Sequence, residues 1–254
     1  KSVVYKKKVE EKHNVCPECD YHFRVSTNER IDITLDKDSF KEYWNDMMPA
    51  DPLKFMDRIK YKDRIISEQE KTKLNEAATV GKGFIDGKEV VFGITDSSFI
   101  MGSMGSVVGE KIARAAEMAL ELRLPLIIVS GSGGGARMHE GAFSLMQMAK
   151  TCAAIARLQD AGLLFISVLT DPTLGGVMAS FASQGDIIIA EPGALVGFAG
   201  PRVIKETIRK TLPKGFQSAE SMLKHGFIDI IAARDRLKPE ISKILDYCNG
   251  NSSC

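Results

Sequence analysis

The sequence predicts an α/β protein in which helices cover a largely parallel β-sheet. Three similar units in the second half of the chain predict this class, because each passes from an apolar strand through a glycine-rich turn toward a helix. The units are LPLIIV into GSGGGA, LLFISVL into TDPTLGG, and DIIIA with ALVGF into AGPRV. A chain of 254 residues, 44% of them hydrophobic, is long enough to bury the core that this class requires.

The N-terminal part differs in composition from the rest. Residues 1–26 are rich in lysine and hold Cys16 and Cys19. Residues 27–80 are polar with weak helical periodicity, so we expect a segment that links this part to a core over residues 81–254. The core begins with the strands GKGFI and KEVVFGI, and the Asp-Gly pair between them is a hairpin signal.

Two helices are expected between the later strands. Residues 109–123 and 139–158 carry apolar side chains at spacings of three and four and are rich in good helix formers. We expect Met138, Met146 and Met148 in the helix core rather than in an acyl pocket. Strand-helix alternation places the glycine turns on one rim, at the carboxyl ends of the strands, where open α/β sheets bind ligands.

Charge and composition exclude several classes. The 34 basic and 33 acidic residues leave a net charge of +1, so no global field attracts nucleic acid or an anionic membrane. The longest apolar segment, residues 162–169, is too short to cross a bilayer, and the N-terminus lacks the pattern of a signal peptide. Five cysteines with one close pair do not form a disulfide framework. A soluble protein of the reducing cytoplasm, with no membrane partner, is therefore expected.

The loop over residues 131–136 fits the dinucleotide pattern G-x-G-x-x-A. The acidic ribose ligand of that pattern is missing, because the next strand ends at Thr170-Asp171, well beyond about 20 residues, and no Gly-Lys-Ser/Thr completes a P-loop. Backbone N–H groups without intrahelical partners can hold an oxyanion, and glycines let an acyl group approach them. A turn that only packs is the alternative, but three such loops on one rim favour a site.

Several longer motifs carry a resemblance. They are FIMGSMGSVVGEK (99–111), GGARM (134–138), SLMQMAK (144–150), VLTDPT (168–173), GD (185–186), AEP (190–192) and GFAGPRVI (197–204). In this order, within a match from Cys16 to about Leu245, they resemble the carboxyltransferase beta subunits of bacterial or plastid acetyl-CoA carboxylase. The resemblance implies a crotonase-like (ClpP/crotonase) ββα superhelix preceded by a four-cysteine zinc ribbon.

The resemblance also implies a reaction. The family transfers the carboxyl group of carboxybiotin, carried on a carrier protein, to acetyl-CoA, giving malonyl-CoA in the first committed step of fatty acid biosynthesis. Implied partners are an alpha subunit, in an alpha2beta2 heterotetramer, and the biotin carboxyl carrier protein and biotin carboxylase of a larger, ATP-binding complex in the cytoplasm or plastid stroma. Deprotonating a thioester methyl puts charge on the carbonyl oxygen, which preformed donors stabilise.

The family motif Ser-Ala-Ser-Gly-Gly-Ala-Arg aligns with SGSGGGAR, which has one additional glycine. The catalytic donor pair is therefore either Gly133 and Gly134 or Gly134 and Gly135. The Arg137 guanidinium can bind either a carboxylate of a partner or a structural Asp or Glu, and the structural role is favoured. The resemblance implies substrate-binding roles for Ala136, Arg137, Gly175, Gly176, Gly197, Gly200 and Arg202. His139 stands where the family usually has Gln.

Cys16-Pro-Glu-Cys19 is half of a zinc ribbon, because a structural Zn²⁺ needs four ligands. The resemblance places the other cysteine pair just before Lys1, so residues 1–26 are expected to form a partial ribbon with Cys16 and Cys19 as metal ligands. His13 and His22 are alternative ligands, but exposed histidines are the favoured interpretation.

Two rival functions stay open. A crotonase-type hydratase or isomerase of acyl-CoA needs two placed carboxylates, and only Glu140 lies next to the glycine loop in sequence. A nucleic-acid-binding module would use the ribbon and the early lysines, but it leaves the glycine loops unexplained.

Overall fold

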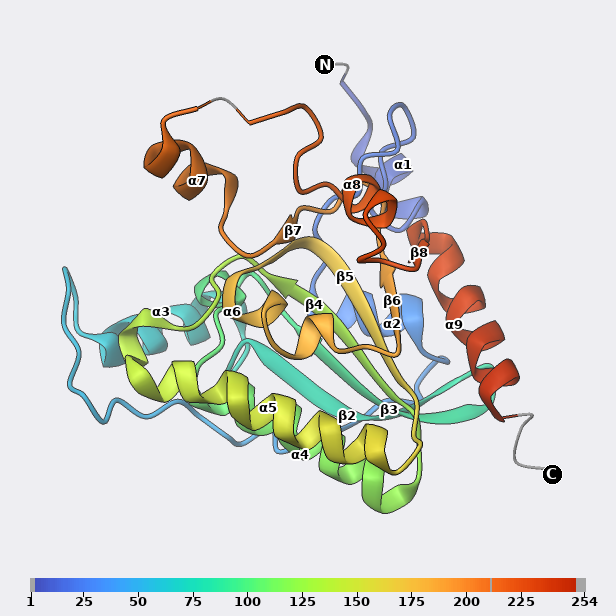
Figure 1. Ribbon diagram of the computed structural model, residues 1–254, viewed down its shortest axis with the longest axis horizontal. Helices are drawn as coiled ribbons and strands as arrows, with labels where there is room; N and C mark the ends of the chain where they lie inside the picture. Colours follow the sequence, from blue (N-terminus) through green and yellow to red (C-terminus); the bar gives the residue numbers. More distant parts are fainter. Residues whose placement is uncertain (1–2, 211, 250–254) are drawn as a thin grey trace.

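One eight-stranded β-sheet forms the centre of the molecule (Figure 1). The computed structural model describes residues 3–210 and 212–249. The strand order is β1-β2-β3-β4-β5-β6-β8, and β7 pairs with the end of β5. The strands are β1 (Lys41–Tyr43), β2 (Ala78–Ile85), β3 (Lys88–Thr95), β4 (Leu126–Ser132), β5 (Phe165–Leu174), β6 (Ile187–Ala190), β7 (Val196–Gly197) and β8 (Ile230–Ile231). This sheet confirms the predicted α/β class.

The sheet changes from antiparallel to parallel at β3. Strands β1, β2 and β3 are antiparallel, whereas β3, β4, β5, β6 and β8 are parallel to one another. The predicted hairpin is confirmed, with Ile85 opposite Lys88. Both turn residues have positive φ, 47° at Asp86 and 76° at Gly87, which matches the right-handed twist of the strands.

Helices cover both faces of the sheet. They are α1 (Lys6–Glu11), α2 (Thr27–Thr34), α3 (Tyr61–Thr72), α4 (Ser106–Leu122), α5 (Ala142–Asp160), α6 (Gly175–Met178), α7 (Pro201–Ile208), α8 (Ala219–Lys224) and α9 (Arg234–Asn249), with short 3₁₀ turns at Ile100–Gly102, Met138–Glu140 and Phe181–Ser183. The two helices predicted from periodicity are α4 and α5, displaced by a few residues. No helix within the described ranges is long and apolar enough to span a bilayer.

Two apolar cores lie on opposite faces of the sheet. One packs α4 and α5 against the strands, through side chains such as Ile112 and Ile155. The other packs the C-terminal helix α9 against the opposite face, through Leu237 and Ile241 (Figure 1). Because the middle strands are buried on both sides, they are continuous apolar runs in the sequence, as parallel strands usually are.

Residues 27–80 do more than link two parts of the chain. Strand β1 pairs with β2, with Lys41 opposite Lys82, so this segment supplies an edge of the sheet. Helix α2 begins with a capping box between Ser26 and Glu29 and packs near α9. Strand β2 begins at Ala78, three residues before the expected boundary at residue 81. Residues before it belong to the same folded unit.

Candidate functional site

The glycine loop after β4 uses two of its backbone amides internally. The N–H groups of Gly133 and Gly134 both donate to the Met101 carbonyl oxygen, at 2.9 and 3.0 Å. Gly135 follows with φ of +58°, a conformation that glycine adopts without strain. Among the described residues, the N–H groups of Gly135 and Ala136 have no hydrogen-bond partner. The free donors of this loop are therefore the two that follow Gly134.

A second loop touches the first one. Strand β5 ends at Leu174, and Gly175, with φ of +62°, donates its N–H to the Phe198 carbonyl at 2.8 Å. The next amide, that of Gly176, has no partner in the part of the chain that the structure describes. A Cβ atom on Gly176 would lie 3.1 Å from the Ala136 nitrogen. Glycine is needed here because the two backbones approach so closely.

The two loops together present free amides from two parallel strands. A Cβ atom on Gly135 would lie 3.1 Å from the Gly176 nitrogen, so these donors are neighbours. Gly135 and Gly176 are buried and Ala136 is half-buried. Unpaired buried N–H groups are rare in folded proteins and can stabilise negative charge that develops beside them. The arrangement suits an anionic oxygen.

This geometry bears on the two donor pairs expected from the sequence. Each of those pairs contains at least one amide that the Met101 carbonyl already occupies. The catalytic role of Gly133, Gly134 and Gly135 stays a prediction. Sequence reasoning placed Ala136 and Gly176 near the substrate but did not identify their amides as free, because no pattern in the sequence shows where the Met101 carbonyl points.

Arg137 is buried beneath the loop and contacts a structural carboxylate. Only 1% of the residue is exposed, and its two terminal nitrogens donate to the two oxygens of Glu76 at 2.6 and 2.5 Å. It also donates to the Tyr61 hydroxyl at 3.0 Å and to the Ser103 carbonyl at 2.8 Å. Burial alone would lower the pKa of Arg137, but the Glu76 carboxylate outweighs burial and raises it. The geometry supports the favoured structural interpretation of Arg137, and its substrate-binding role stays a prediction.

Glu140 completes this buried cluster. Its carboxylate accepts from the Tyr61 hydroxyl at 2.7 Å and from the Ser106 N–H, at the start of α4, at 2.6 Å. His139 stacks on the Tyr61 ring, with centroids 4.9 Å apart, and its Nδ1 atom is buried without a partner. Burial raises the pKa of Tyr61 and lowers that of His139. Because Glu140 is engaged on both oxygens, it does not supply the acid or base that a hydratase needs.

The remaining predicted residues lie on the segment that carries α7. Gly197 is in β7, which pairs with Leu174 beside the second loop. Gly200 is the N-cap of α7, and the Arg202 side chain is 89% exposed, 3.5 Å from Glu206 one turn along the helix. The structure thus brings Gly197 to the glycine loops, while Arg202 extends from the surface.

Exposed apolar side chains surround the glycine loops. Met138 and Met146 are 67% and 62% exposed, so the expectation that they lie in the helix core is wrong, whereas Met148 packs partly against the core. Met101 and Phe198, whose carbonyls hold the two loops, are also exposed. Apolar patches of this kind are typical of surfaces that bind a ligand or a partner protein.

Cys16 and Cys19 are the predicted metal ligands of the N-terminal part. Cys16 is buried and Cys19 exposed, both as free thiols, and the Glu18 N–H lowers the pKa of Cys16. Across residues 3–210 and 212–249, no three His, Cys, Asp or Glu side chains are grouped to hold a metal ion. His22 is only 6% exposed, contrary to expectation, because its Nε2 accepts from the Arg234 N–H at 3.3 Å.

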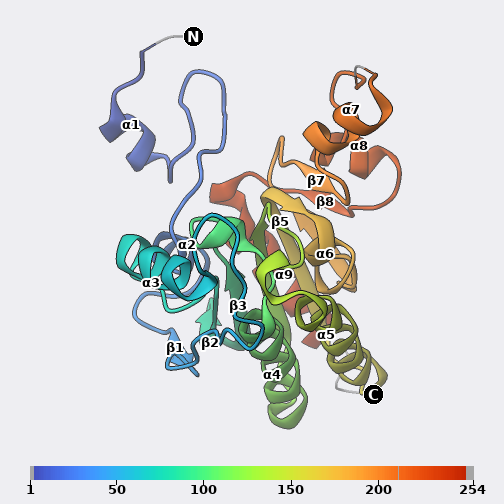
Figure 2. The ribbon, with the colours of Figure 1, turned by 90° about the vertical axis from the view of Figure 1, so that its left-hand side faces the viewer.

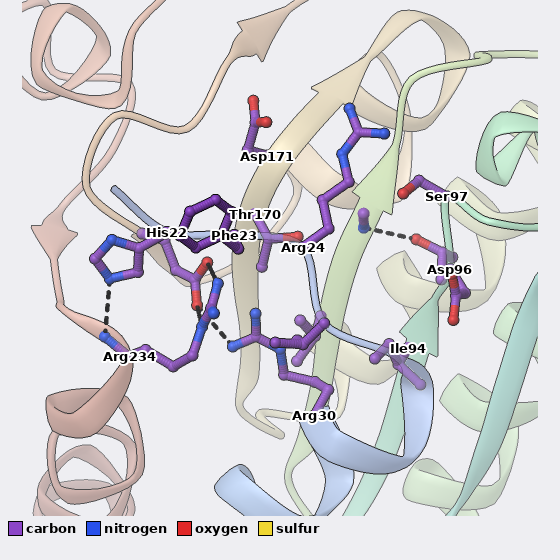
Figure 3. A pocket seen from close by; sticks show the side chains of 15 residues that line it. His22, Phe23, Arg24, Arg30, Ile94, Asp96, Ser97, Thr170, Asp171 and Arg234 are labelled. Carbon is purple, nitrogen blue, oxygen red and sulfur yellow. Dashed lines mark hydrogen bonds and ion pairs between the residues drawn. The ribbon is translucent and has the colours of Figure 1, made fainter. Parts of the chain in front are cut away.

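A buried ion cluster joins the N-terminal part to the sheet (Figure 3). Glu191 accepts from Arg30 at 2.7 Å and from Arg234 at 2.9 and 2.8 Å, and Arg234 also donates to the His13 carbonyl at 2.8 Å. Burial raises the pKa of Glu191, but its hydrogen bonds and the two positive charges outweigh burial and lower it to about 2.

The cavity beside this cluster, at the carboxyl ends of β3, β4 and β5, has a volume of about 30 Å³. Such a volume holds a water molecule or little more. Figure 2 shows the N-terminal residues and the α7–α8 segment at the same end of the molecule, on opposite sides. The cavity is lined by residues of the N-terminal part, such as His22 and Arg24, and by residues of the strands, such as Thr95 and Thr170. It therefore lies at the contact between the N-terminal part and the sheet, and the glycine loops remain the candidate site.

Comparisons with known proteins agree with this fold. A model of the carboxyl transferase domain matches residues 24–252. The beta subunit of the acetyl-coenzyme A carboxylase carboxyl transferase of Rhodopirellula baltica is 56% identical over 245 residues, which cover 96% of this chain and 78% of that protein. The beta/alpha carboxyl transferase protein of Clostridium tetani is 54% identical over 243 residues, 96% of this chain and 42% of that protein.

Among solved structures, transcarboxylase 12S with methylmalonyl-coenzyme A and methylmalonic acid bound superposes with a TM-score of 0.73. It is 25% identical, and the match covers 94% of this chain and 43% of that chain. The predicted crotonase-like fold and carboxyltransferase class are confirmed. The chain belongs to the carboxyl transferase family and, within it, to the beta subunits of acetyl-CoA carboxylase carboxyl transferase.

Proposed function

We propose that this chain holds acetyl-CoA while a carboxyl group passes to it from carboxybiotin on a carrier protein, giving malonyl-CoA. The observation that carries the proposal is the set of free backbone amides of Gly135, Ala136 and Gly176 on two touching loops. We assign the thioester carbonyl oxygen to these amides. This assignment retains Gly135 as a member of the expected donor set. Ala136 and Gly176 take the place of Gly133 and Gly134.

The chemistry requires stabilisation of an enolate. Removing a proton from the methyl group of the thioester moves charge to the carbonyl oxygen, and donors aimed at that oxygen lower the barrier because their interaction strengthens as the charge develops. One such donor is typically worth about 3–4 kcal/mol. Carboxybiotin supplies the carboxyl group as a substrate and, after losing it, a basic ureido nitrogen that takes the proton. No side-chain base of this chain is needed.

The proposed partner is an alpha subunit that brings carboxybiotin to the loops. Two observations support it, the fusion of beta and alpha subunits in the Clostridium tetani relative and the exposed apolar side chains of Met101, Met138, Met146 and Phe198 around the site. We place the chain in an alpha2beta2 heterotetramer that works with the carrier protein and biotin carboxylase in fatty acid biosynthesis.

A structural zinc ion is part of the proposal for the N-terminal part. Cys16 and Cys19 fit it, because two thiolates separated by two residues on a knuckle can share one tetrahedral ion, and the lowered pKa of Cys16 favours the thiolate that binds metal. Two further ligands are required for a closed site. The ion would order residues around Cys16, and the proposed reaction does not involve it.

The experiment is reconstitution. Purified alpha subunit and biotinylated carrier are mixed with malonyl-CoA, and carboxyl transfer to biotin is measured with and without this chain. We expect transfer only when both subunits are present, since in this proposal each subunit binds one of the two substrates. Equal rates without this chain would refute the proposal. So would rapid turnover of an enoyl-CoA by this chain alone, which would instead support a hydratase.

A further inference from the structure

We propose that Tyr61, Glu76 and Glu140 are positioning residues that hold the Gly135–Ala136 amides in place through Arg137. The inference rests on the proposed function, because it assigns these residues to the same site. None of the three touches the free amides. Two of them, Tyr61 and Glu76, lie in the part of the chain that the sequence indicates to be only a linking segment.

The backbone around Ala136 is tied to the preceding loop on both sides. The Gly135 carbonyl accepts from the Met104 N–H at 2.7 Å, and the Arg137 N–H donates to the Met104 carbonyl at 2.9 Å. The Arg137 side chain binds Ser103, the residue before Met104, and donates to the Ser103 carbonyl at 2.8 Å and to the Ser103 hydroxyl at 3.1 Å. Residues 103–104 and 135–137 therefore form one hydrogen-bonded unit whose orientation depends on the Arg137 guanidinium.

Three separate elements fix that guanidinium. The Glu76 carboxylate accepts hydrogen bonds from both terminal nitrogens of Arg137. It also accepts one from the Ala77 N–H at 2.6 Å, just before β2 begins. Tyr61, near the start of α3, accepts from Arg137 and donates to Glu140. Glu140 in turn accepts from the Ser106 N–H at the start of α4. The loop is thus anchored to β2, α3 and α4 at once.

Burial makes these contacts specific. The side chains of Arg137, Glu76 and Glu140 are at most 1% exposed, and Tyr61 is fully buried. Water therefore cannot replace a lost partner, and a buried charge without its partner is strongly unfavourable. A planar guanidinium held at two carboxylate oxygens has one orientation, which a flexible ammonium group would not have. The cluster thus sets direction as well as stability.

Direction matters because donors of this kind act only when aimed at the developing charge. A displacement of about 1 Å at a catalytic group can lower the rate by about 10²-fold. The Tyr61 hydroxyl is the smallest part of the cluster that can be removed, since the ring that stacks on His139 remains in a phenylalanine variant. Its loss leaves Arg137 and Glu140 facing each other at 3.6 Å without the bridging group.

The test compares Tyr61→Phe with the stability control Ile241→Val in full-length chains assembled with alpha subunit. Ile241 is fully buried in the core on the opposite face of the sheet and has no part in the cluster. For Tyr61→Phe we expect kcat of carboxyl transfer to fall about tenfold while KM for malonyl-CoA changes less than about twofold, as for a misdirected donor. Ile241→Val should lower the melting temperature with kcat unchanged.

A second readout does not depend on activity. Amide hydrogen exchange of a peptide covering residues 133–141 should quicken in Tyr61→Phe and stay unchanged in Ile241→Val. Unchanged exchange and kcat in Tyr61→Phe, or equal kcat losses in both variants, would overturn the inference. If the unmodified assembly transfers no carboxyl group, the proposed function fails, and the exchange measurement still decides whether Tyr61 holds the loop.

Discussion

Replacing Gly135 by alanine separates a catalytic amide from a turn that only packs. An L-residue at φ of +58° costs about 1–2 kcal/mol of stability. The new Cβ would lie 3.1 Å from the Gly176 nitrogen and 3.3 Å from the Gly175 Cα, so the second loop must move by a few tenths of an ångström. The methyl group then occupies space beside the amide assigned to the thioester oxygen. We expect kcat to fall at least about 10²-fold, the loss typical of one oxyanion donor.

The matched control is Gly162→Ala, because Gly162 has φ of +72° and an added Cβ would meet no atom within 4 Å. Both variants should lose stability in thermal melts followed by circular dichroism, and Gly135→Ala should lose more because its Cβ also displaces the second loop. Only Gly135→Ala should lose turnover when malonyl-CoA-dependent carboxyl transfer is assayed with the alpha subunit. Near-normal turnover in Gly135→Ala, or equal losses in both variants, would show that the amides around Gly135 do not hold the reacting oxygen.

Three further predictions follow from charge and exposure. The pKa of Glu191 is lowered from its ordinary 4.5 to about 2, so above pH 4.5 this group adds up to about 3 kcal/mol to the free energy of unfolding. That contribution is lost as pH falls toward 2. Urea unfolding should show the loss in the parent chain and not in Glu191→Gln. Burial lowers the pKa of His139 below 6.5, so the parent should lose stability as pH falls below 6.5, and His139→Gln should remove that part of the pH dependence. Arg202→Ala should change the free energy of unfolding by less than about 0.5 kcal/mol, because its ion pair with Glu206 is exposed. That variant should nevertheless raise KM for malonyl-CoA or weaken binding to the alpha subunit, and a titration in which neither changes would remove Arg202 from the proposed site.

Local patterns predicted the parts of the fold that local interactions determine. The Asp86-Gly87 hairpin and the helices α4 and α5 depend on residues close together in sequence, and all three are present. The glycine loops lie at the carboxyl ends of β4 and β5, as strand-helix alternation indicates. The motifs within and beside those loops, compared with a known family, also predicted the reaction class.

Contacts between residues far apart in the sequence could not be predicted from it. Arg137 and Glu76 are separated by 61 positions, and neither periodicity nor composition pairs them. The same holds for β1, a three-residue edge strand without alternation, and for His22, which looks like an exposed polar residue until Arg234 is placed beside it. Met138 and Met146 carry a helical apolar pattern, but a pattern does not tell whether the face that it marks packs inward or meets another protein.

The spacing between the two loops is set by the sheet and not by the loops themselves. Pairing of β4 with β5 is regular to Ser130 and Leu169 and shifts register before Ser132 meets Thr173. At this irregularity the hydroxyl groups of Thr170 and Thr173 both donate to the Ser130 carbonyl, at 2.8 and 2.9 Å. These buried bonds hold the ends of the two strands in one relative position. The free amides of Ala136 and Gly176, which follow those strand ends, are therefore also held in a fixed relative position. A donor pair built from two neighbouring parallel strands is therefore as rigid as their ladder, which is the preorganisation that stabilising a transient negative charge requires.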